Sequence, residues 1–132
     1  MFLVLEPTDN VILNWSTIAP YIGQAIAKTR IDEEPPNYYE LVRTQKVHVV
    51  SIWGDDLIGI MLIGIDEDWL HVYVLTGNLP EGWDTILFHW LAYTALTNNC
   101  NTISLRGRKG WIRKLKHLGF EEYNGDIIRR LK

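Results

Sequence analysis

The chain has 132 residues, which is enough for one hydrophobic core and too few for two ordinary domains, so we expect a single domain over residues 1–132. Its single cysteine, Cys100, excludes a disulfide framework and a cysteine-based zinc site, and the four histidines lack metal-ligand spacing. No apolar run approaches the roughly 20 residues that a membrane span needs, and the N-terminus does not resemble a signal peptide. We therefore expect a soluble, cytoplasmic protein that binds no metal and contacts no membrane.

The net charge of −3 hides a strong asymmetry along the chain. Residues 1–105 carry four basic and thirteen acidic side chains, a formal −9, whereas residues 106–132 carry nine and three, a formal +6. A basic end of this kind attracts nucleic acid, a phosphorylated cofactor or an acidic partner. It can equally be the solvated face of a helix that neutralises the acidic body of the same molecule.

The N-terminal third predicts a strand followed by two helices. Phe2–Leu5 has the pattern of a short strand, and apolar residues from Val11 to Ile26 recur at helical spacing. Pro20 and Gly23 predict a kink or a break within that helix. A second helix is expected over Pro36–Thr44, because proline is tolerated in a first helical turn.

The middle of the chain predicts an antiparallel meander. Residues 46–77 form three runs rich in β-branched and aromatic residues, separated by short turns at Gly54–Asp56 and Asp66–Asp68. The middle run, Leu57–Ile65, is almost wholly apolar, which indicates a central strand covered on both faces.

The remaining elements follow a turn at residues 77–82: a helix from Trp83 to about Leu96, a strand at Thr102–Leu105, a helix from about Arg108 to Leu118, and short strands near Glu122 and Ile127. The passage from the third meander strand through the long helix predicts a crossover to a parallel strand. We therefore expect an α/β (α+β) fold with a mixed, mostly antiparallel sheet of about six or seven strands, helices on both faces, and the order β-α-α-β-β-β-α-β-α-β-β.

This element order, the hairpin "GDDLIGIMLIG" and the stretch "WIRKLKHLGFEEY" resemble the GNAT superfamily of acyl-CoA-dependent N-acetyltransferases. In that family a helix ending in Leu-Gly-Phe-Glu leads into the closing strands, as Leu118–Glu121 does here. Gly119 can end the helix in a left-handed conformation, and Phe120 is expected to enter the core. The resemblance implies acetyl-CoA as cofactor and an amine as acceptor.

The resemblance also places a cofactor site around "TGNLPEGWD", residues 76–84. Family members hold the pyrophosphate with a loop of Arg/Gln-x-x-Gly-x-Gly type at a helix N-terminus. Here Gly82 keeps its place, Leu79 stands where the basic or amide residue would be, and Asp84 replaces the last glycine. The cofactor-binding residues that the resemblance implies are Val74, Leu75, Thr76, Gly77, Gly82, Trp83 and Arg108.

The catalytic residues of the family match this chain poorly. The place of the tyrosine that protonates the leaving thiolate falls at Leu115, and that of the asparagine before the helix falls at Arg108. The candidates for acid or base are Asp68, His71, Tyr73 and Tyr123. Each has a structural alternative: His71 and Tyr73 alternate with apolar residues on one sheet face, and Asp68 suits a turn.

Three functions are compatible with these patterns. The first is an N-acetyltransferase that uses acetyl-CoA and an amine. The second is a non-catalytic GNAT-fold protein with a protein partner, since the "GRKGW" run and the altered loop resemble divergent bacteriophage proteins, which would place it in the host cytoplasm or the virion. The third, nucleic-acid binding by the basic C-terminal face, is disfavoured because Trp111, the one aromatic residue within 106–117, lies on the apolar stripe of its helix. The oligomeric state stays open.

Overall fold

The structure is a computed structural model that describes residues 1–28, 35–106 and 109–131. One seven-stranded sheet runs through it in the order β1-β2-β3-β4-β5-β7-β6. The strands are β1 (Phe2–Leu5), β2 (His48–Trp53), β3 (Leu57–Asp66), β4 (Trp69–Gly77), β5 (Thr102–Leu105), β6 (Glu121–Tyr123) and β7 (Asp126–Arg130). Only the pairing of β4 with β5 is parallel among these neighbours. The predicted mixed, mostly antiparallel sheet is therefore confirmed.

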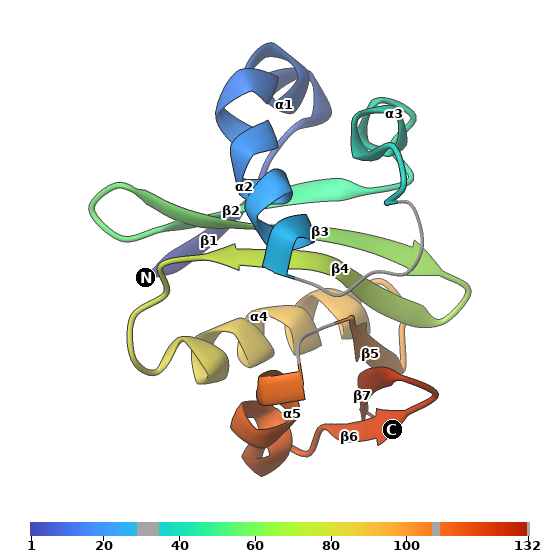
Figure 1. Ribbon diagram of the computed structural model, residues 1–132. Helices are drawn as coiled ribbons and strands as arrows, with labels where there is room; N and C mark the ends of the chain where they lie inside the picture. The colour runs from blue at the N-terminus through green and yellow to red at the C-terminus, as the bar shows by residue number, and fades with distance from the viewer. Residues whose placement is uncertain (29–34, 107–108, 132) are drawn as a thin grey trace.

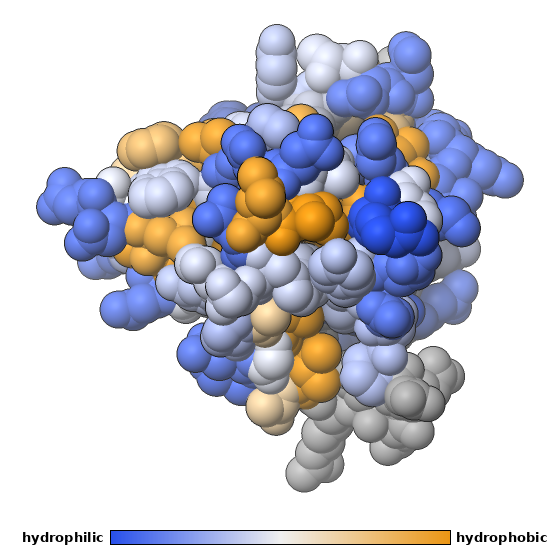
Figure 2. All heavy atoms as spheres, turned by 90° about the horizontal axis from the view of Figure 1, so that it is seen from above, coloured by the Kyte–Doolittle hydropathy of each residue, from blue (hydrophilic) through white to orange (hydrophobic). Residues whose placement is uncertain are grey.

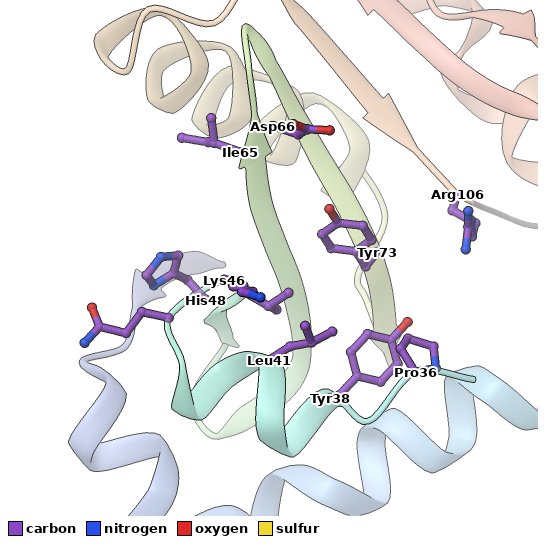
Figure 3. Close-up of a pocket in the computed structure, with 11 residues that line it drawn as sticks. Pro36, Tyr38, Leu41, Lys46, His48, Ile65, Asp66, Tyr73 and Arg106 are labelled. Atoms are coloured by element: carbon purple, nitrogen blue, oxygen red, sulfur yellow. The ribbon is translucent and has the colours of Figure 1, made fainter. Parts of the chain in front are cut away.

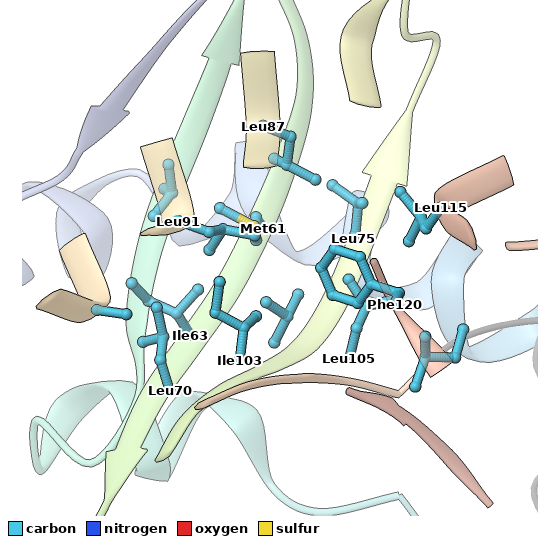
Figure 4. Packing of buried hydrophobic residues seen from close by; sticks show 14 of the residues in the cluster. Met61, Ile63, Leu70, Leu75, Leu87, Leu91, Ile103, Leu105, Leu115 and Phe120 are labelled. Carbon is cyan, nitrogen blue, oxygen red and sulfur yellow. The ribbon is translucent and has the colours of Figure 1, made fainter. Parts of the chain in front are cut away.

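Helices cover both faces of the sheet (Figure 1). The helices on one face are α1 (Thr8–Leu13), α2 (Trp15–Lys28) and α3 (Tyr38–Arg43), and those on the other are α4 (Trp83–Thr97) and α5 (Lys109–Leu115), which continues into the short 3-10 helix η1 (Lys116–Leu118). Each face buries its own hydrophobic cluster. Figure 4 shows the larger cluster, in which the strands pack against α4 and α5. Met61 belongs to this cluster, whereas its neighbours Ile60 and Leu62 belong to the other, so β3 is buried on both faces as expected.

Seen from the side of α1 and α3, the surface alternates between polar and apolar residues, and its apolar atoms form separate patches (Figure 2). Within residues 1–28, 35–106 and 109–131, no helix combines the length and the apolar character that crossing a membrane requires.

The first helical region breaks at Asn14, six residues before the expected position. Asn14 has φ −109° and ψ 23°, and its Nδ2 donates to the Asn10 carbonyl at 2.8 Å, which ends α1. Helix α2 then runs through Pro20 to Lys28. A proline inside a helix removes one backbone hydrogen bond, and here the burial of Ile18 and Ile22 against the sheet offsets that loss. The prediction of a break at Pro20 or Gly23 was therefore wrong in position.

Gly23 is an exposed residue in the interior of α2, and an added Cβ would meet nothing within 4 Å. Because glycine is about 0.8–1.0 kcal/mol less favourable than alanine inside a helix, we expect Gly23→Ala to raise the free energy of unfolding by up to about that amount. Urea denaturation followed by circular dichroism measures the change. A lower midpoint in the variant would contradict the placement of Gly23 on an open helix face.

The junction after η1 has the conformation expected from the sequence. Gly119 adopts a left-handed backbone with φ 89°, and Phe120 is 4% exposed within the larger core cluster. The Nε of Arg129 donates to the Leu118 carbonyl at 2.9 Å, which ties the end of the helix to β7. The predicted glycine cap and the insertion of Phe120 into the core are confirmed.

Candidate functional site

Strands β4 and β5 separate where Val72 of β4 lies beside Arg106, at the end of β5. This point of separation is here called the notch. The parallel register runs from Trp69 beside Thr102 to Val72 beside Leu105, and the Arg106 N–H donates to the Val72 carbonyl at 3.1 Å. Beyond this point β4 continues to Gly77, whereas β5 has ended. The notch thus opens one edge of β4 in the middle of the sheet.

An irregular register at Tyr73 marks the same point on β4. Leu62 pairs with Val74 and Ile63 pairs with Val72, so Tyr73 lies between the two pairs as an extra residue. A β-bulge of this kind bends its strand and increases the local twist. The bulge therefore accounts for the divergence of β4 from β5 immediately after Val72.

The main chain of β4 beyond the bulge presents hydrogen-bonding groups to the notch. The Asn78 N–H donates to the Ile58 carbonyl of β3 at 2.9 Å. Because backbone groups of a strand alternate between its two edges, Leu75 and Gly77 direct their N–H and C=O groups away from β3 and towards the notch. Backbone groups at the edge of a strand can pair with another extended chain, so this edge can bind a chain rich in amides.

A cavity of about 220 Å³, here called the notch cavity, adjoins this edge. Its lining consists of Leu75, Thr76, Gly77, Asn78, Leu79, Trp83 and Trp111. Trp83 is 8% exposed and its ring lies 6.2 Å from that of Trp111, so the two indoles form a wall and leave the cavity open. The buried Thr76 Oγ1 finds no hydrogen-bond partner among the described residues. Side chains alternate along a strand, and Ile60, which pairs with Thr76, packs in the cluster on the other face, so this hydroxyl points to the α2 face of the sheet and not into the notch cavity.

Gly77 and Gly82 have different roles in the turn that precedes α4. At Gly77, with φ 143°, an added Cβ would lie 2.3 Å from the Ile58 carbonyl oxygen and 2.5 Å from the Gly59 Cα. Its missing side chain therefore lets β4 approach β3. Gly82 is left-handed with φ 84° and precedes α4, and an added Cβ there would meet nothing within 4 Å.

The charges at the start of α4 are arranged unfavourably for an anion in the turn. Asp84 is 7% exposed, and its Oδ2 lies 3.1 Å from the His117 Nε2 of η1. A carboxylate in the first turn stabilises a helix through the helix dipole, but it also repels a nearby phosphate. The Nζ of Lys114 lies 5.7 Å from the Trp83 ring, so one cation of α5 borders the notch cavity.

A second pocket, here called the α3 pocket, has a volume of about 560 Å³ and lies on the other face of the sheet (Figure 3). Its lining consists of Pro36, Tyr38, Leu41, Gln45, Lys46, Val47, His48, Ile65, Asp66, Tyr73 and Arg106. Burial raises the pKa of both the Tyr38 and the Tyr73 hydroxyl, and the Arg106 charge lowers each pKa by a smaller amount. Both hydroxyls are therefore protonated at neutral pH and act as hydrogen-bond donors.

Three of the four catalytic candidates, His71, Tyr73 and Tyr123, belong to one row of aromatic rings, and the fourth, Asp68, lies in a turn. The Trp69, His71 and Tyr73 rings form a row along β4, with centroids 5.9 Å and 5.8 Å apart, and Tyr123 lies 6.2 Å from Trp69. Asp68 precedes β4 and accepts from the Asn101 Nδ2 at 2.8 Å, as a turn residue would.

Only Tyr73 of these candidates reaches the notch and lines the α3 pocket. The His71 Nδ1 is hydrogen-bonded to the Ser104 hydroxyl of β5. At about 3.4 Å per residue, Asp68 lies roughly 15 Å along the strand from the notch. Leu115, which replaces the family's tyrosine, is 2% exposed in the core. Arg108 lies outside the described residues.

Reasoning from the sequence missed the α3 pocket apart from Tyr73, and two of its missed residues, Arg106 and Tyr38, carry polar groups that the proposed function uses. Arg106 lines the α3 pocket from the end of β5, and Tyr38 lines it from α3. A signal for Arg106 was present, since it is the first cation after a buried strand and opens the basic end of the chain. Tyr38 carried no such signal because its neighbours in the pocket are distant in sequence.

The fold is that of the GNAT acetyltransferases. An acetyltransferase of the GNAT family from Staphylococcus aureus superposes with a TM-score of 0.66 at 12% identity, covering 99% of each chain. Tetrahymena GCN5 superposes with a TM-score of 0.64 at 14% identity, covering 93% of this chain and 88% of its own. PaiA N-acetyltransferase from Thermoplasma acidophilum, solved in complex with coenzyme A, gives 0.59 at 12% identity, covering 98% and 99%. No protein-family model and no curated protein sequence matches the chain.

Proposed function

We propose that the chain is an acyl-CoA-dependent N-acyltransferase formed by one domain over residues 1–132. The observation that carries the proposal is the edge of β4 beyond Val72, which faces the notch beside the notch cavity. The structures with this fold include GNAT acetyltransferases, one of them with coenzyme A. Bound acetyl-CoA would supply an acetyl group activated as a thioester.

The residues of the notch cavity fit the pantetheine arm of the donor. The N–H and C=O groups of Leu75 and Gly77 are oriented to pair with the amides of that arm, as one strand pairs with another. Trp83 and Trp111 supply an apolar wall. We propose that these residues hold the donor and orient its thioester towards the notch.

The residues at the start of α4 fit the phosphates of the donor less well than the notch cavity fits its pantetheine arm. The Leu79 side chain offers no donor group, and the Asp84 carboxylate lies at the helix N-terminus where a pyrophosphate would bind. Lys114, beside Trp83, supplies a compensating positive charge from α5. We therefore expect the pantetheine arm to contribute more to affinity than the phosphates do.

The acceptor amine would reach the notch through the α3 pocket. Arg106 connects the two sites, because its N–H closes the notch on Val72 while its side chain lines the pocket. Tyr73, protonated at neutral pH, can donate a hydrogen bond there but cannot act as a base. Catalysis then rests mainly on holding the amine against the thioester, an effect that can contribute on the order of 7–11 kcal/mol.

The test combines acetyl-CoA with a panel of primary amines and amino acids, and measures acetylated products by mass spectrometry. We expect time-dependent product that requires the protein and grows with its concentration. Absence of product across the panel, together with an unchanged melting temperature at millimolar acetyl-CoA, would refute the acyltransferase function.

A role as an interaction module is favoured by one further observation. The outer face of α4 carries Ile86, Tyr93 and Leu96, which are 42%, 71% and 45% exposed and recur at helical spacing. Exposed apolar stripes of this kind often mark contacts with another protein. Sedimentation velocity tests self-association through this face: a dimer that Tyr93→Lys dissociates would support it, and a monomer at all concentrations would exclude a homo-oligomer.

A further inference from the structure

We infer that the α3 pocket selects an acceptor with a carboxylate next to its amine, that is, an α-amino acid with an apolar side chain. The inference rests on the proposed acyl transfer and adds the class of its acceptor. The pocket has more positive than negative side chains in its lining, with Lys46 and Arg106 against Asp66. An anionic group on the ligand would balance this excess.

Arg106 is placed to bind that group. Its Nε lies 3.9 Å from the Asp126 Oδ1, and the two side chains are 65% and 38% exposed. A guanidinium has five N–H donors in a planar fork that suits a carboxylate. Among the described residues, Asp126 is the one carboxylate paired with Arg106, and this long contact leaves most of the guanidinium donors to a ligand.

Tyr38 and Tyr73 add two neutral hydroxyl donors to the same region. All three residues line the α3 pocket. Burial raises the pKa of both hydroxyls; the Arg106 charge opposes this at each of them, and the Asp66 carboxylate adds to the rise at Tyr73. Figure 3 shows Arg106 at the end of β5 on the same side of the pocket as the Tyr38 hydroxyl. Charge-assisted hydrogen bonds from such a set are stronger than neutral ones, so a carboxylate is preferred over a neutral polar group.

The position of Arg106 limits the distance between the carboxylate and the amine. The reacting amine must reach the notch, which the hydrogen bond from the Arg106 N–H to the Val72 carbonyl marks. A group bound by the Arg106 side chain is then within one side-chain length of that amine. This spacing suits an α-amino acid, whose amine and carboxylate are attached to the same carbon.

The other residues that line the α3 pocket determine which side chain the amino acid acceptor can carry. Pro36, Leu41, Val47 and Ile65 line it together with the tyrosine rings. Burial of apolar surface against these residues contributes about 25 cal/mol per Å². An aliphatic or aromatic side chain on the amino acid therefore fits better than a charged one.

The experiment compares two small probes that differ only in the carboxylate: N-acetyl-L-leucine and N-(3-methylbutyl)acetamide. Both resemble the product of transfer, so binding is measured without turnover, by titration into the full isotope-labelled chain and two-dimensional NMR. We expect N-acetyl-L-leucine to bind roughly tenfold more tightly, as a charge-assisted hydrogen bond predicts, and to shift the signals of Tyr38, Tyr73 and Arg106.

Three variants define the role of Arg106. Arg106→Gln should abolish the preference for the carboxylate, Arg113→Gln, an exposed cation of α5, should leave it unchanged, and Asp126→Asn should increase it by removing a competing carboxylate. Equal affinities for the two probes, binding of neither, or a preference that survives Arg106→Gln would overturn the inference. A parallel titration with acetyl-CoA reports on the notch cavity alone, so failure of the acceptor class and failure of acyl transfer are distinguishable.

Discussion

Gly77→Ala is expected to destabilise the protein by about 3 kcal/mol or more, the cost of a steric conflict that the backbone cannot relieve. The new Cβ would lie 2.3 Å from the Ile58 carbonyl oxygen and 2.5 Å from the Gly59 Cα, both of which belong to the main chain of β3. Relief requires β4 to separate from β3 at the end that borders the notch cavity. The Gly77→Ala protein that does fold should therefore also bind acetyl-CoA more weakly than the wild type. Urea denaturation and isothermal titration calorimetry measure the two effects.

Gly82→Ala is the matched control for this variant. Gly82 lies in the same turn with φ 84°, and an added Cβ meets nothing within 4 Å, so only the left-handed conformation is penalised, by roughly 1–2 kcal/mol. We expect the folded Gly82→Ala protein to bind acetyl-CoA more tightly than Gly77→Ala does. Equal stability of the two variants would contradict the close approach of β4 to β3.

Lys114→Glu is expected to weaken acetyl-CoA binding by roughly tenfold at low salt, because the reversal replaces attraction of the phosphates by repulsion. Lys114 lies over Trp83 at the notch cavity, whereas Lys116 is an exposed cation of η1. Lys116→Glu, with the same change in net charge, should have a smaller effect. Calorimetry with acetyl-CoA measures both.

The cause of the weaker binding by Lys114→Glu can be tested with a donor that lacks the adenosine and its attached phosphates. Affinity for S-acetylpantetheine should be unchanged by Lys114→Glu, since this donor carries no phosphate. Equal losses in the Lys114 and Lys116 variants would show a general charge effect, and a loss with S-acetylpantetheine would show a steric one. High salt should reduce the difference between wild type and variant.

Most of the fold could be predicted because periodicity and turn chemistry act locally. The run Leu57–Ile65 contains enough apolar residues to be buried on both faces, and Gly119 is one of few residues suited to the left-handed end of a helix. The misplaced break in the first helix shows the limit of local rules. Pro20 is tolerated because tertiary burial of α2 offsets its cost, whereas Asn14 ends α1 through a side-chain hydrogen bond to Asn10.

The candidate site was predictable only where it follows one strand. Leu75, Thr76 and Gly77 of the predicted stretch line the notch cavity, whereas Val74 packs on the other face of the sheet, and strand and turn could be predicted together because they are contiguous in sequence. The bulge at Tyr73 depends on register between β3 and β4, for which no single residue carries a signal. The α3 pocket draws Tyr38, Tyr73 and Arg106 from three elements, so its composition follows from topology.

The amides of Leu75 and Gly77 offer the most direct test of the central claim, which is that the edge of β4 beyond the notch holds the pantetheine arm of an acyl donor. Two-dimensional NMR of the labelled chain, titrated with acetyl-CoA and with S-acetylpantetheine, follows these signals individually. We predict that both ligands shift the Leu75 and Gly77 amides in a saturable manner. Unchanged positions of these amides at millimolar concentrations of both ligands would contradict the claim.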